Sequence, residues 1–302
     1  MLDISAIILT FNEEMHIKRC LDNISSIVKE IFIIDSYSTD RTLTIAKEYE
    51  NVIVLQNKWV NYATQFNWGL KNAPIKTEWV IRLDADEYLL PELVEELEQK
   101  MPHLEENITG ITLKRRHIFL GKWMRRGTYP VKLLRIFKAN KAICEERFMD
   151  EHIQLLEGTS VEMENDFVDH NLNNISWWAN KHVGYAIREA VDLLDIELDL
   201  TGSAATDEGR NINEQAQAKR MKKHKYARQP LFWRSFAYFC YRYFFKLGFL
   251  EGKEGFLWNF LQGWWYRTLV DAKIYEIKKA CGNDKAKIKQ HLKEHYGIEL
   301  SN

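Results

Sequence analysis

The 302-residue sequence has few cysteines, no excess of charge of either sign and no long apolar run. Its four cysteines are scattered and form no CxxC pair, which argues against a cysteine-ligated metal or a disulfide framework. Lys plus Arg number 42 and Asp plus Glu 43, a balance that argues against nucleic acid as a partner. The longest uncharged run of the aromatic C-terminal part, GFLWNFLQGWWY, has 12 residues, too few to span a bilayer.

The N-terminal stretch MLDISAIILTFNEE has no basic residue ahead of its apolar run and reaches acids by Glu13. It is typical of a first strand and not of a signal peptide. Scattered cysteines suit a reducing compartment, so we expect a cytoplasmic protein.

Four short apolar runs in the first hundred residues are typical of strands covered on both faces: 6–10, 30–35, 51–55 and 78–84. Helical patterns lie between them. Asn12 and Asp40 are predicted N-caps of the first two helices, and Pro91 is predicted to begin a later one. The alternation predicts an α/β fold with a Rossmann-like, mostly parallel sheet flanked by helices.

Polar motifs follow three of the predicted strands: TFNEE at 10–14, DSYSTD at 35–40 and DADE at 84–87. In such sheets ligands bind beyond the carboxyl ends of the strands, so we expect the three motifs to form one rim. The acids of DADE repel one another unless a cation lies among them, which predicts a bound metal ion. Taken singly, Asn12 and Asp40 are equally well explained as helix caps, and DADE as a solvated acidic turn.

The motifs ILTFNEE, IIDSYSTDRT and RLDADE, in this order, resemble the nucleotide-sugar domain of inverting glycosyltransferases of family 2, which have the GT-A fold. The resemblance covers about half the chain. It continues more weakly through GKWMRRGTYPVKLLRIFK and ERFMDEH, where it is similar to the bacterial lipopolysaccharide-core β-1,4-glucosyltransferase branch. It implies transfer of one sugar from a nucleotide-diphosphate donor to a lipid-linked surface glycan. Ser36 stands where the family often has a second acid, so the nucleoside of the donor stays open, with uridine as the default.

By this resemblance, Asp86 ligates Mg²⁺ or Mn²⁺ and Asp84 reaches the ribose or a metal-bound water. Such an ion stabilises the departing diphosphate as a Lewis acid. His170 is a further candidate metal or diphosphate contact, although a lone histidine is more often structural. The nucleotide sugar is expected to contact Thr10, Asn12, Glu14, Asp35, Gln65 and Asp84. Gln65 is almost as well explained as a polar residue of an amphipathic helix.

The catalytic base is predicted to be a carboxylate of RFMDEH, either Asp150 or Glu151. Inverting transfer needs a base for the acceptor hydroxyl, and a carboxylate bound to metal has little basicity left. Adjacent residues of an extended chain face opposite ways, so only one of the two can face the site. The resemblance favours Glu151. The alternative is that both acids are solvated or pair with Arg147.

We expect a GT-A catalytic domain at 1–172, with a nucleotide-sugar half at 1–105 and an acceptor half at 106–172. Residues 173–302 are expected to be helical, with a mobile polar segment near 199–222. Residues 226–266 hold 17 of the 38 aromatic residues, and the segment from Lys219 to Asp271 has 11 Lys or Arg against three acids. This segment is predicted to bind anionic lipid at the inner face of the cell membrane without spanning it. The alternative is a helical subdomain packed on the catalytic domain.

Two other functions stay open from the sequence. The chain could be a catalytically weak nucleotide-binding scaffold that its basic aromatic segment recruits to membrane. It could also be a sugar nucleotidyltransferase, although its acidic TFNEE replaces the Gly-rich basic loop that a triphosphate needs.

Overall fold

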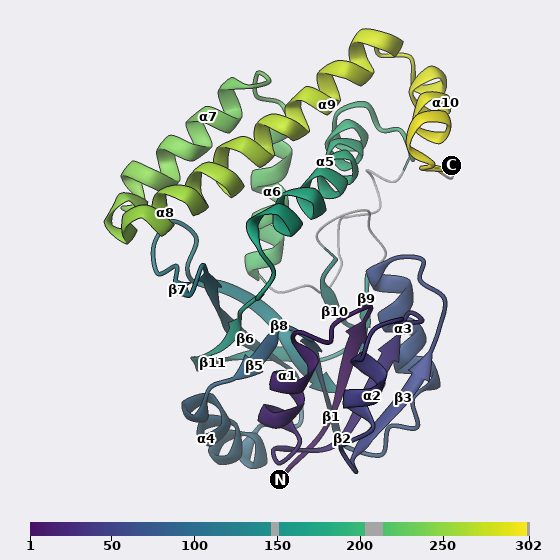
Figure 1. The fold of residues 1–302 in the computed structure, drawn as a ribbon, viewed down its shortest axis with the longest axis vertical. Coiled ribbons are helices and arrows are strands. Elements are labelled where there is room, and N and C mark those ends of the chain that lie inside the picture. The colour runs from purple at the N-terminus through teal and green to yellow at the C-terminus, as the bar shows by residue number, and fades with distance from the viewer. Residues whose placement is uncertain (146–150, 203–213, 301–302) are drawn as a thin grey trace.

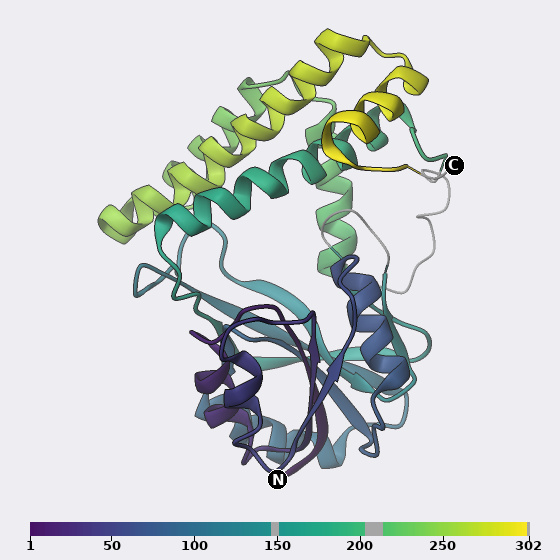
Figure 2. The same cartoon turned by 45° about the vertical axis from the view of Figure 1, so that its right-hand side comes forward.

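A computed structural model describes residues 1–145, 151–202 and 214–300 of the chain. Its first part is a sheet flanked by helices, and its last part is a layer of helices (Figure 1). In Figures 1 and 2 the carboxyl ends of β1 and β2 point toward this helical layer, and β4 runs parallel to β1. The α/β class and the helical, aromatic-rich C-terminal region predicted from the sequence are confirmed.

The main sheet has nine strands in the order β3-β2-β1-β4-β8-β6-β11-β5, with β7 paired to β6. Neighbours among β3, β2, β1 and β4 run parallel, as predicted, and β11 runs parallel to β6. Strand β8 is antiparallel to both of its neighbours, and β5 is antiparallel to β11. Strands β9 and β10 form a separate pair. The strands are β1 Leu2–Thr10, β2 Val28–Asp35, β3 Val52–Gln56, β4 Trp79–Asp84, β5 Glu87–Leu89, β6 Ile108–Phe119, β7 Lys122–Trp123, β8 Val131–Lys138, β9 Ala142–Cys144, β10 Ile153–Leu155 and β11 Thr159–Asp169.

The helices of the sheet region are α1 Ile17–Ile24, α2 Thr42–Ala46, α3 Tyr62–Asn72, α4 Pro91–Lys100 and the 3₁₀ turn η1 Met101–His103. Pro91 begins α4 as predicted. Asp40 accepts a hydrogen bond at 2.9 Å from the backbone N–H of Thr42, so it caps α2 from just outside the helix. The prediction for Asn12 was wrong, because α1 begins only at Ile17 and Asn12 has φ 56°.

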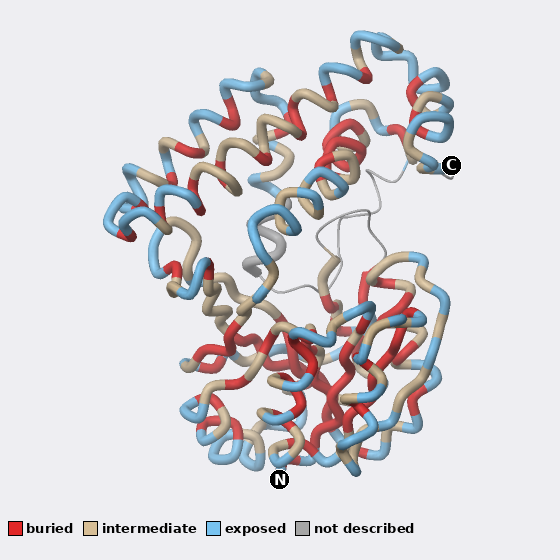
Figure 3. Tube along the Cα trace, in the orientation of Figure 1, coloured by how far each residue is buried: buried red, intermediate tan, exposed pale blue. Residues whose placement is uncertain are grey.

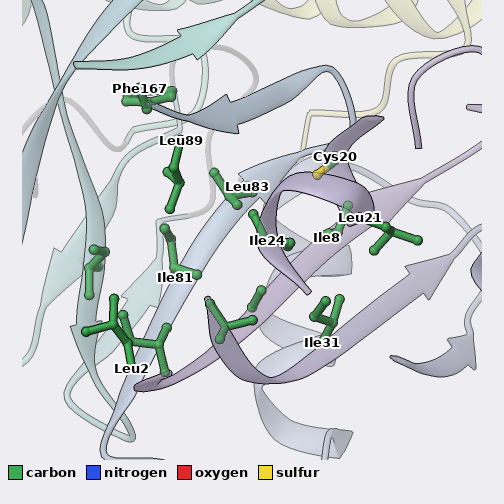
Figure 4. Packing of buried hydrophobic residues seen from close by; sticks show 14 of the residues in the cluster. Leu2, Ile8, Cys20, Leu21, Ile24, Ile31, Ile81, Leu83, Leu89 and Phe167 are labelled. Atoms are coloured by element: carbon green, nitrogen blue, oxygen red, sulfur yellow. The ribbon is translucent and has the colours of Figure 1, made fainter. Parts of the chain in front are cut away.

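Two clusters of buried side chains cover the opposite faces of the sheet, because alternate residues of a strand point to opposite sides. In Figure 4, Leu21 and Ile24 of α1 pack near Ile8 of β1. Each fully buried Leu or Ile side chain contributes about 1.5–3 kcal/mol to folding. Figure 3 shows the buried residues concentrated in this part of the molecule. The polar strand ends are therefore held on a rigid base.

The C-terminal helices form their own core, in which α5 packs along α9. Residues Glu214–Ala227 form α6, so residues 214–222 of the segment predicted to be mobile are helical. No helix in the described part of the chain is long and apolar enough to cross a membrane. The elements are α5 Ile175–Leu198, α6 Glu214–Ala227, α7 Trp233–Cys240, η2 Tyr241–Phe245, η3 Gly248–Glu251, α8 Gly252–Trp258, η4 Asn259–Trp265, α9 Tyr266–Cys281 and α10 Lys285–Tyr296.

The helical layer contacts the sheet through the loop between β7 and β8 and through α8. The backbone N–H of Gly127 donates to the carbonyl of Lys246 at 3.3 Å, with Gly127 at φ 88°, where a side chain would be strained. The ring of His117 on β6 lies 4.3 Å from that of Trp258 on α8. These contacts fix the helices beside the carboxyl end of the sheet.

Candidate active site

The register of the strands brings the predicted motifs to one edge. Thr10 pairs with Asp35 across β1 and β2, and Leu9 pairs with Asp84 across β1 and β4. On the other side of the site, Asp169 of β11 pairs with Glu87 of β5 and with His117 of β6. The ends of five strands and the start of β5 therefore surround the same position.

Thr10, Asp35 and Gln65 form one buried hydrogen-bonded group at the first rim. Thr10 Oγ1 donates to Asp35 Oδ1 at 2.9 Å, and the backbone N–H of Ser38 and Gln56 Nε2 donate to Asp35 Oδ2 at 2.9 and 3.1 Å. Gln65 Nε2 donates to Ser36 Oγ at 3.1 Å. The carboxylate of Asp35 thus organises this rim from beneath, and its role toward a nucleoside stays a prediction.

Asn12 and Glu14 are exposed and hold the next loop. Asn12 Oδ1 accepts from the backbone N–H of Thr39 at 2.8 Å. Glu14 Oε2 accepts from Nε of Arg41 at 3.2 Å. The left-handed backbone of Asn12 turns the chain away from the sheet so that these contacts can form. Both residues lie next to the Thr10 and Asp35 rim.

Glu87, the third acid of DADE, forms an ion pair with an arginine of the same chain. Arg135 on β8 is buried, and its Nη2 lies 2.5 Å from Oε1 of Glu87 and 3.5 Å from Oδ2 of Asp84. Arg82 Nε lies 3.9 Å from Oδ1 of Asp84. The idea that all three acids await an external cation is therefore wrong for Glu87 and, in part, for Asp84. The charges of the two arginines overcome the effect of burial and lower the pKa of Asp84.

Asp86 is different, because no cationic side chain among the described residues forms an ion pair with it. Asn171 Nδ2 donates to its Oδ2 at 2.8 Å. Burial, followed by the charges of Asp169 and Asp84, raises the pKa of Asp86 to about 6. Carboxylate oxygens are the donors that Mg²⁺ and Mn²⁺ prefer, so this uncompensated charge fits a divalent ion.

Asp169, at the end of β11, lies close to the three acids of DADE. We call Asp84, Asp86, Glu87 and Asp169 the acid group. Its Oδ2 lies 3.2 Å from Nδ1 of His117 and 3.3 Å from Nη1 of Arg115. Burial alone would raise the pKa of Asp169, but His117 and Arg115 lower it well below its ordinary value. The described residues contain no group of three or more His, Cys, Asp or Glu side chains arranged to hold a metal. A divalent ion on Asp86 would therefore keep positions for phosphate oxygens and water.

His170 lies beside Asp86, and one of its ring nitrogens already has a hydrogen-bond partner. Its backbone N–H donates to the carbonyl of Asp86 at 3.0 Å, and its Nδ1 lies 3.2 Å from Nη1 of Arg19. Since a guanidinium only donates, Nδ1 is the acceptor and Nε2 carries the proton of the neutral ring. A metal would therefore have to displace Arg19 from Nδ1 or the proton from Nε2. Burial, followed by the charge of Arg19, lowers the pKa of His170, which keeps the ring neutral as a ligand requires.

Asp150, one of the two predicted bases, lies outside the described residues. Glu151 is described and partly buried. Burial raises the pKa of Cys144 to about 11, the charge of Arg82 opposes this, and the charge of Glu151 adds to it. Arg82 Nη1 lies 3.8 Å from Cys144 Sγ, and the same arginine approaches Asp84. The charge of Glu151 thus acts on Cys144, whose sulfur lies beside Arg82.

Sequence reasoning missed Arg135, Asp169 and His117. Arg135 interrupts the apolar strand VKLLRIFK, and a charged residue within a buried strand indicates a buried partner. Asp169 precedes His170 at the end of a strand, so the strand-end rule applied to TFNEE and DADE would have found it. His117 had no local signal, because only the pairing of β6 with β11 places it beside Asp169.

Comparisons with known proteins agree with this geometry. An uncharacterized glycosyltransferase of Rickettsia bellii is 36% identical over 95 residues, which are 32% of this chain and 31% of that protein. A dolichyl N-acetyl-α-D-glucosaminyl phosphate 3-β-D-2,3-diacetamido-2,3-dideoxy-β-D-glucuronosyltransferase of Methanococcus voltae is 41% identical over 81 residues, 23% of this chain and 25% of that protein. The chain thus spans about a third or less of the length of these two curated relatives.

A solved structure of a mannosyltransferase from Pyrobaculum calidifontis, in complex with GDP-Man and Mn²⁺, has a TM-score of 0.53 at 14% identity. The similarity covers 90% of this chain and 87% of that one, and the GT-A fold expected from the sequence is confirmed. The family model described as Glycosyl transferase family 2 matches residues 5–155. With half of its 302 residues in that match, the chain belongs to glycosyl transferase family 2.

Proposed function

We propose that the protein is an inverting glycosyltransferase that moves a single sugar from a nucleotide-diphosphate donor to a lipid-linked saccharide. The observation that carries the proposal is the meeting of Asp84, Asp86 and Asp169 next to the Thr10 and Asp35 rim, at the carboxyl edge of a family 2 domain. Nucleotides bind at this edge of such sheets. Uridine is the proposed nucleoside of the donor. The proposed donor site is formed by Thr10, Asn12, Glu14, Asp35, Gln65 and Asp84.

A divalent ion, Mg²⁺ or Mn²⁺, is proposed to bind at Asp86, with His170 as a second candidate ligand if its hydrogen bond with Arg19 gives way. When bound, the ion would stabilise the negative charge of the departing diphosphate. Asp84 is held by Arg135 and Arg82 and is left to orient the donor through the ribose or a metal-bound water. The mannosyltransferase of similar fold was solved with GDP-Man and Mn²⁺, which supports a metal of this kind.

Glu151 is the proposed base, with Asp150 as the alternative. We propose that it lies apart from the metal ligand Asp86, so it would not lose its basicity to the metal; its charge acts on Cys144. The acceptor hydroxyl gives its proton to this carboxylate while its oxygen attacks the anomeric carbon. The bond from that carbon to the diphosphate oxygen breaks, and its electron pair leaves with the diphosphate.

A lipid-linked acceptor is supported by the aromatic surface beside the site. We define the ring surface as the exposed apolar and aromatic side chains from η2 to α8: Tyr241, Phe244, Phe245, Leu247, Phe249, Leu250, Phe256 and Leu257. A pocket of about 610 Å³ lies in it, with Lys253 among its lining residues. Of the two acids between 226 and 266, Glu251 is buried and Glu254 is partly exposed beside Lys122, whereas Arg228, Lys246 and Lys253 are exposed. An apolar surface bordered by cations is complementary to an anionic bilayer.

The structure changes the argument from the basic residues, because several of them are internal. Arg234 is buried and pairs with Asp271 at 2.6 Å, and Arg242 is fully buried. Fewer cations are therefore available to attract anionic lipid than the composition indicated. The exposed side chains of the ring surface are proposed to contribute more of the binding. Peripheral binding at the inner face of the cell membrane is the proposed location. The relative from Methanococcus voltae, by its name, acts on a dolichyl phosphate-linked sugar.

A panel of nucleotide sugars with Mn²⁺ or Mg²⁺ tests the proposal. We expect hydrolysis of one UDP-sugar in the absence of acceptor, and its loss in EDTA. Hydrolysis of none of the donors, with UDP still bound, would favour the scaffold function. Release of pyrophosphate from UTP and a sugar phosphate would instead identify a nucleotidyltransferase.

A further inference from the structure

Lys181 on α5 is a half-buried lysine close to the acid group. Its ammonium lies 4.6 Å from the ring centroid of Trp177 and 5.7 Å from that of Tyr185. Within the described parts of the chain it forms no ion pair with a carboxylate. Burial opposes its charged form, but Tyr185 and the charge of Asp86 raise the pKa of Lys181 above its ordinary value. The lysine is therefore charged and has aromatic neighbours in place of a carboxylate partner among the described residues.

The contacts of α5 determine which way Lys181 faces. One turn further along, Tyr185 Oη lies 3.4 Å from Tyr62 Oη of α3, on the sheet side. One turn earlier, the ring of Trp178 lies 6.4 Å from that of Trp258 on α8. Helical residues three or four positions apart share a face, so Lys181 is directed toward the same end of the sheet.

The site thus has carboxylates on the strand ends and an ammonium on the helix above them, without a direct ion pair between Lys181 and Asp86. An arrangement of this kind suits a ligand that carries a metal ion on one side and negative oxygens on the other. We propose that Lys181 binds the diphosphate of the nucleotide-sugar donor from the side opposite Asp86. This inference rests on the proposed function and adds a residue that the motifs did not indicate.

The chemistry of transfer gives such a lysine a role. As the bond from the anomeric carbon breaks, its electron pair passes to a diphosphate oxygen, whose negative charge increases. A fixed ammonium next to that oxygen stabilises the transition state more than the bound donor. Lys181 keeps its proton throughout, so it is a binding group and not the acid or the base.

Calorimetry with Mn²⁺, comparing UDP with uridine, tests the inference. Lys181→Met removes the charge and keeps a stem of similar size, and we expect a loss of about tenfold or more in UDP affinity. Lys181→Arg should recover part of that loss, and uridine, which has no phosphate, should bind all forms alike. Lys225→Met, which removes an exposed lysine of α6, is the matched control and should bind UDP as the parent does.

Equal UDP affinity in Lys181→Met and the parent would overturn the inference. An equal loss for UDP and uridine would also overturn it, because it would indicate a disturbed fold and not a lost phosphate contact. The calorimetric result can be interpreted independently of the nucleotide-sugar assay. If UDP binding depends on Lys181 while no nucleotide sugar is turned over, the diphosphate site stands and the proposed transfer fails.

Discussion

Glu87 and Arg135 form a buried ion pair beneath the acid group, with 2.5 Å between Oε1 and Nη2. Glu87 Oε2 also accepts the backbone N–H of Asp84 at 2.9 Å, so the pair holds the turn that carries Asp84 and Asp86. Burial, opposed by Arg135, raises the pKa of Glu87 well above its ordinary value. The pair is therefore structural, and the metal-binding role falls on its neighbours.

Replacing Arg135 with Met should lower the free energy of unfolding by about 3–5 kcal/mol, because it leaves a buried carboxylate without its partner. The double variant Arg135→Met with Glu87→Gln should lose less than the single one, since position 87 then carries no unpaired charge and Asp84 keeps Arg82. Urea unfolding measures both. The control is Lys18→Met, which breaks an exposed ion pair with Asp22 and should leave stability nearly unchanged. A double variant as unstable as the sum of both single changes would contradict the pairing.

The raised pKa of Asp86 predicts a pH dependence of stability in the absence of divalent ions. Between its ordinary pKa of 3.8 and about 6, the folded protein holds a proton on Asp86 that the unfolded chain releases. The free energy of unfolding should therefore decrease as pH rises through this range, by about 1–3 kcal/mol from this group. Asp86→Asn should be more stable than the parent at pH 7 in EDTA, and equal to it near pH 4. Identical pH profiles of parent and variant would show that Asp86 is not perturbed.

The first four strands and their parallel pairing could be predicted from the sequence, because buried parallel strands are continuous apolar runs and their polar ends share one edge. The partners of those ends could not. Arg135 is 48 positions from Glu87, and only the register of antiparallel strands brings them together. In the C-terminal part, η2 and η4 are π-helical, so apolar residues do not repeat at 3.6 and sequence periodicity could not show that Arg242 is buried.

Binding of UDP should depend on a divalent ion at Asp86. Calorimetry should show UDP affinity falling in EDTA, because the acids then repel the diphosphate. Asp86→Asn should reduce the Mn²⁺-dependent affinity by about 100-fold, because it removes the proposed metal ligand. Asp3→Asn removes an exposed acid near the start of β1, at the far end of the same strand, and is the control. Equal affinity with and without Mn²⁺ would remove the metal from the proposal.

The ring surface should bind anionic vesicles. We expect the protein to sediment with vesicles that contain phosphatidylglycerol at low salt, less at high salt, and little with pure phosphatidylcholine. Phe245→Ser with Phe249→Ser should reduce binding about tenfold or more, since Phe245 is 79% exposed and its removal does not disturb the core. Leu156→Ser changes a residue 56% exposed in the sheet region and should have no effect. Protein that stays in the supernatant at low salt would leave the packed-subdomain alternative.

Glu151→Gln should reduce sugar transfer by about 100-fold or more, because the amide cannot take the proton of the acceptor hydroxyl. UDP affinity should be unchanged, since Glu151 lies near Cys144 and Arg82 and not on the proposed metal ligand. Asp150→Asn is the comparison: adjacent residues of an extended chain face opposite ways, so we expect a large effect at one position only. Turnover measured with donor and acceptor, beside calorimetry with UDP, separates a lost base from a lost donor site. A Glu151→Gln variant that transfers sugar at the parent rate, with Asp150→Asn inactive, would move the base to Asp150. Parent rates in both would place the base outside this motif.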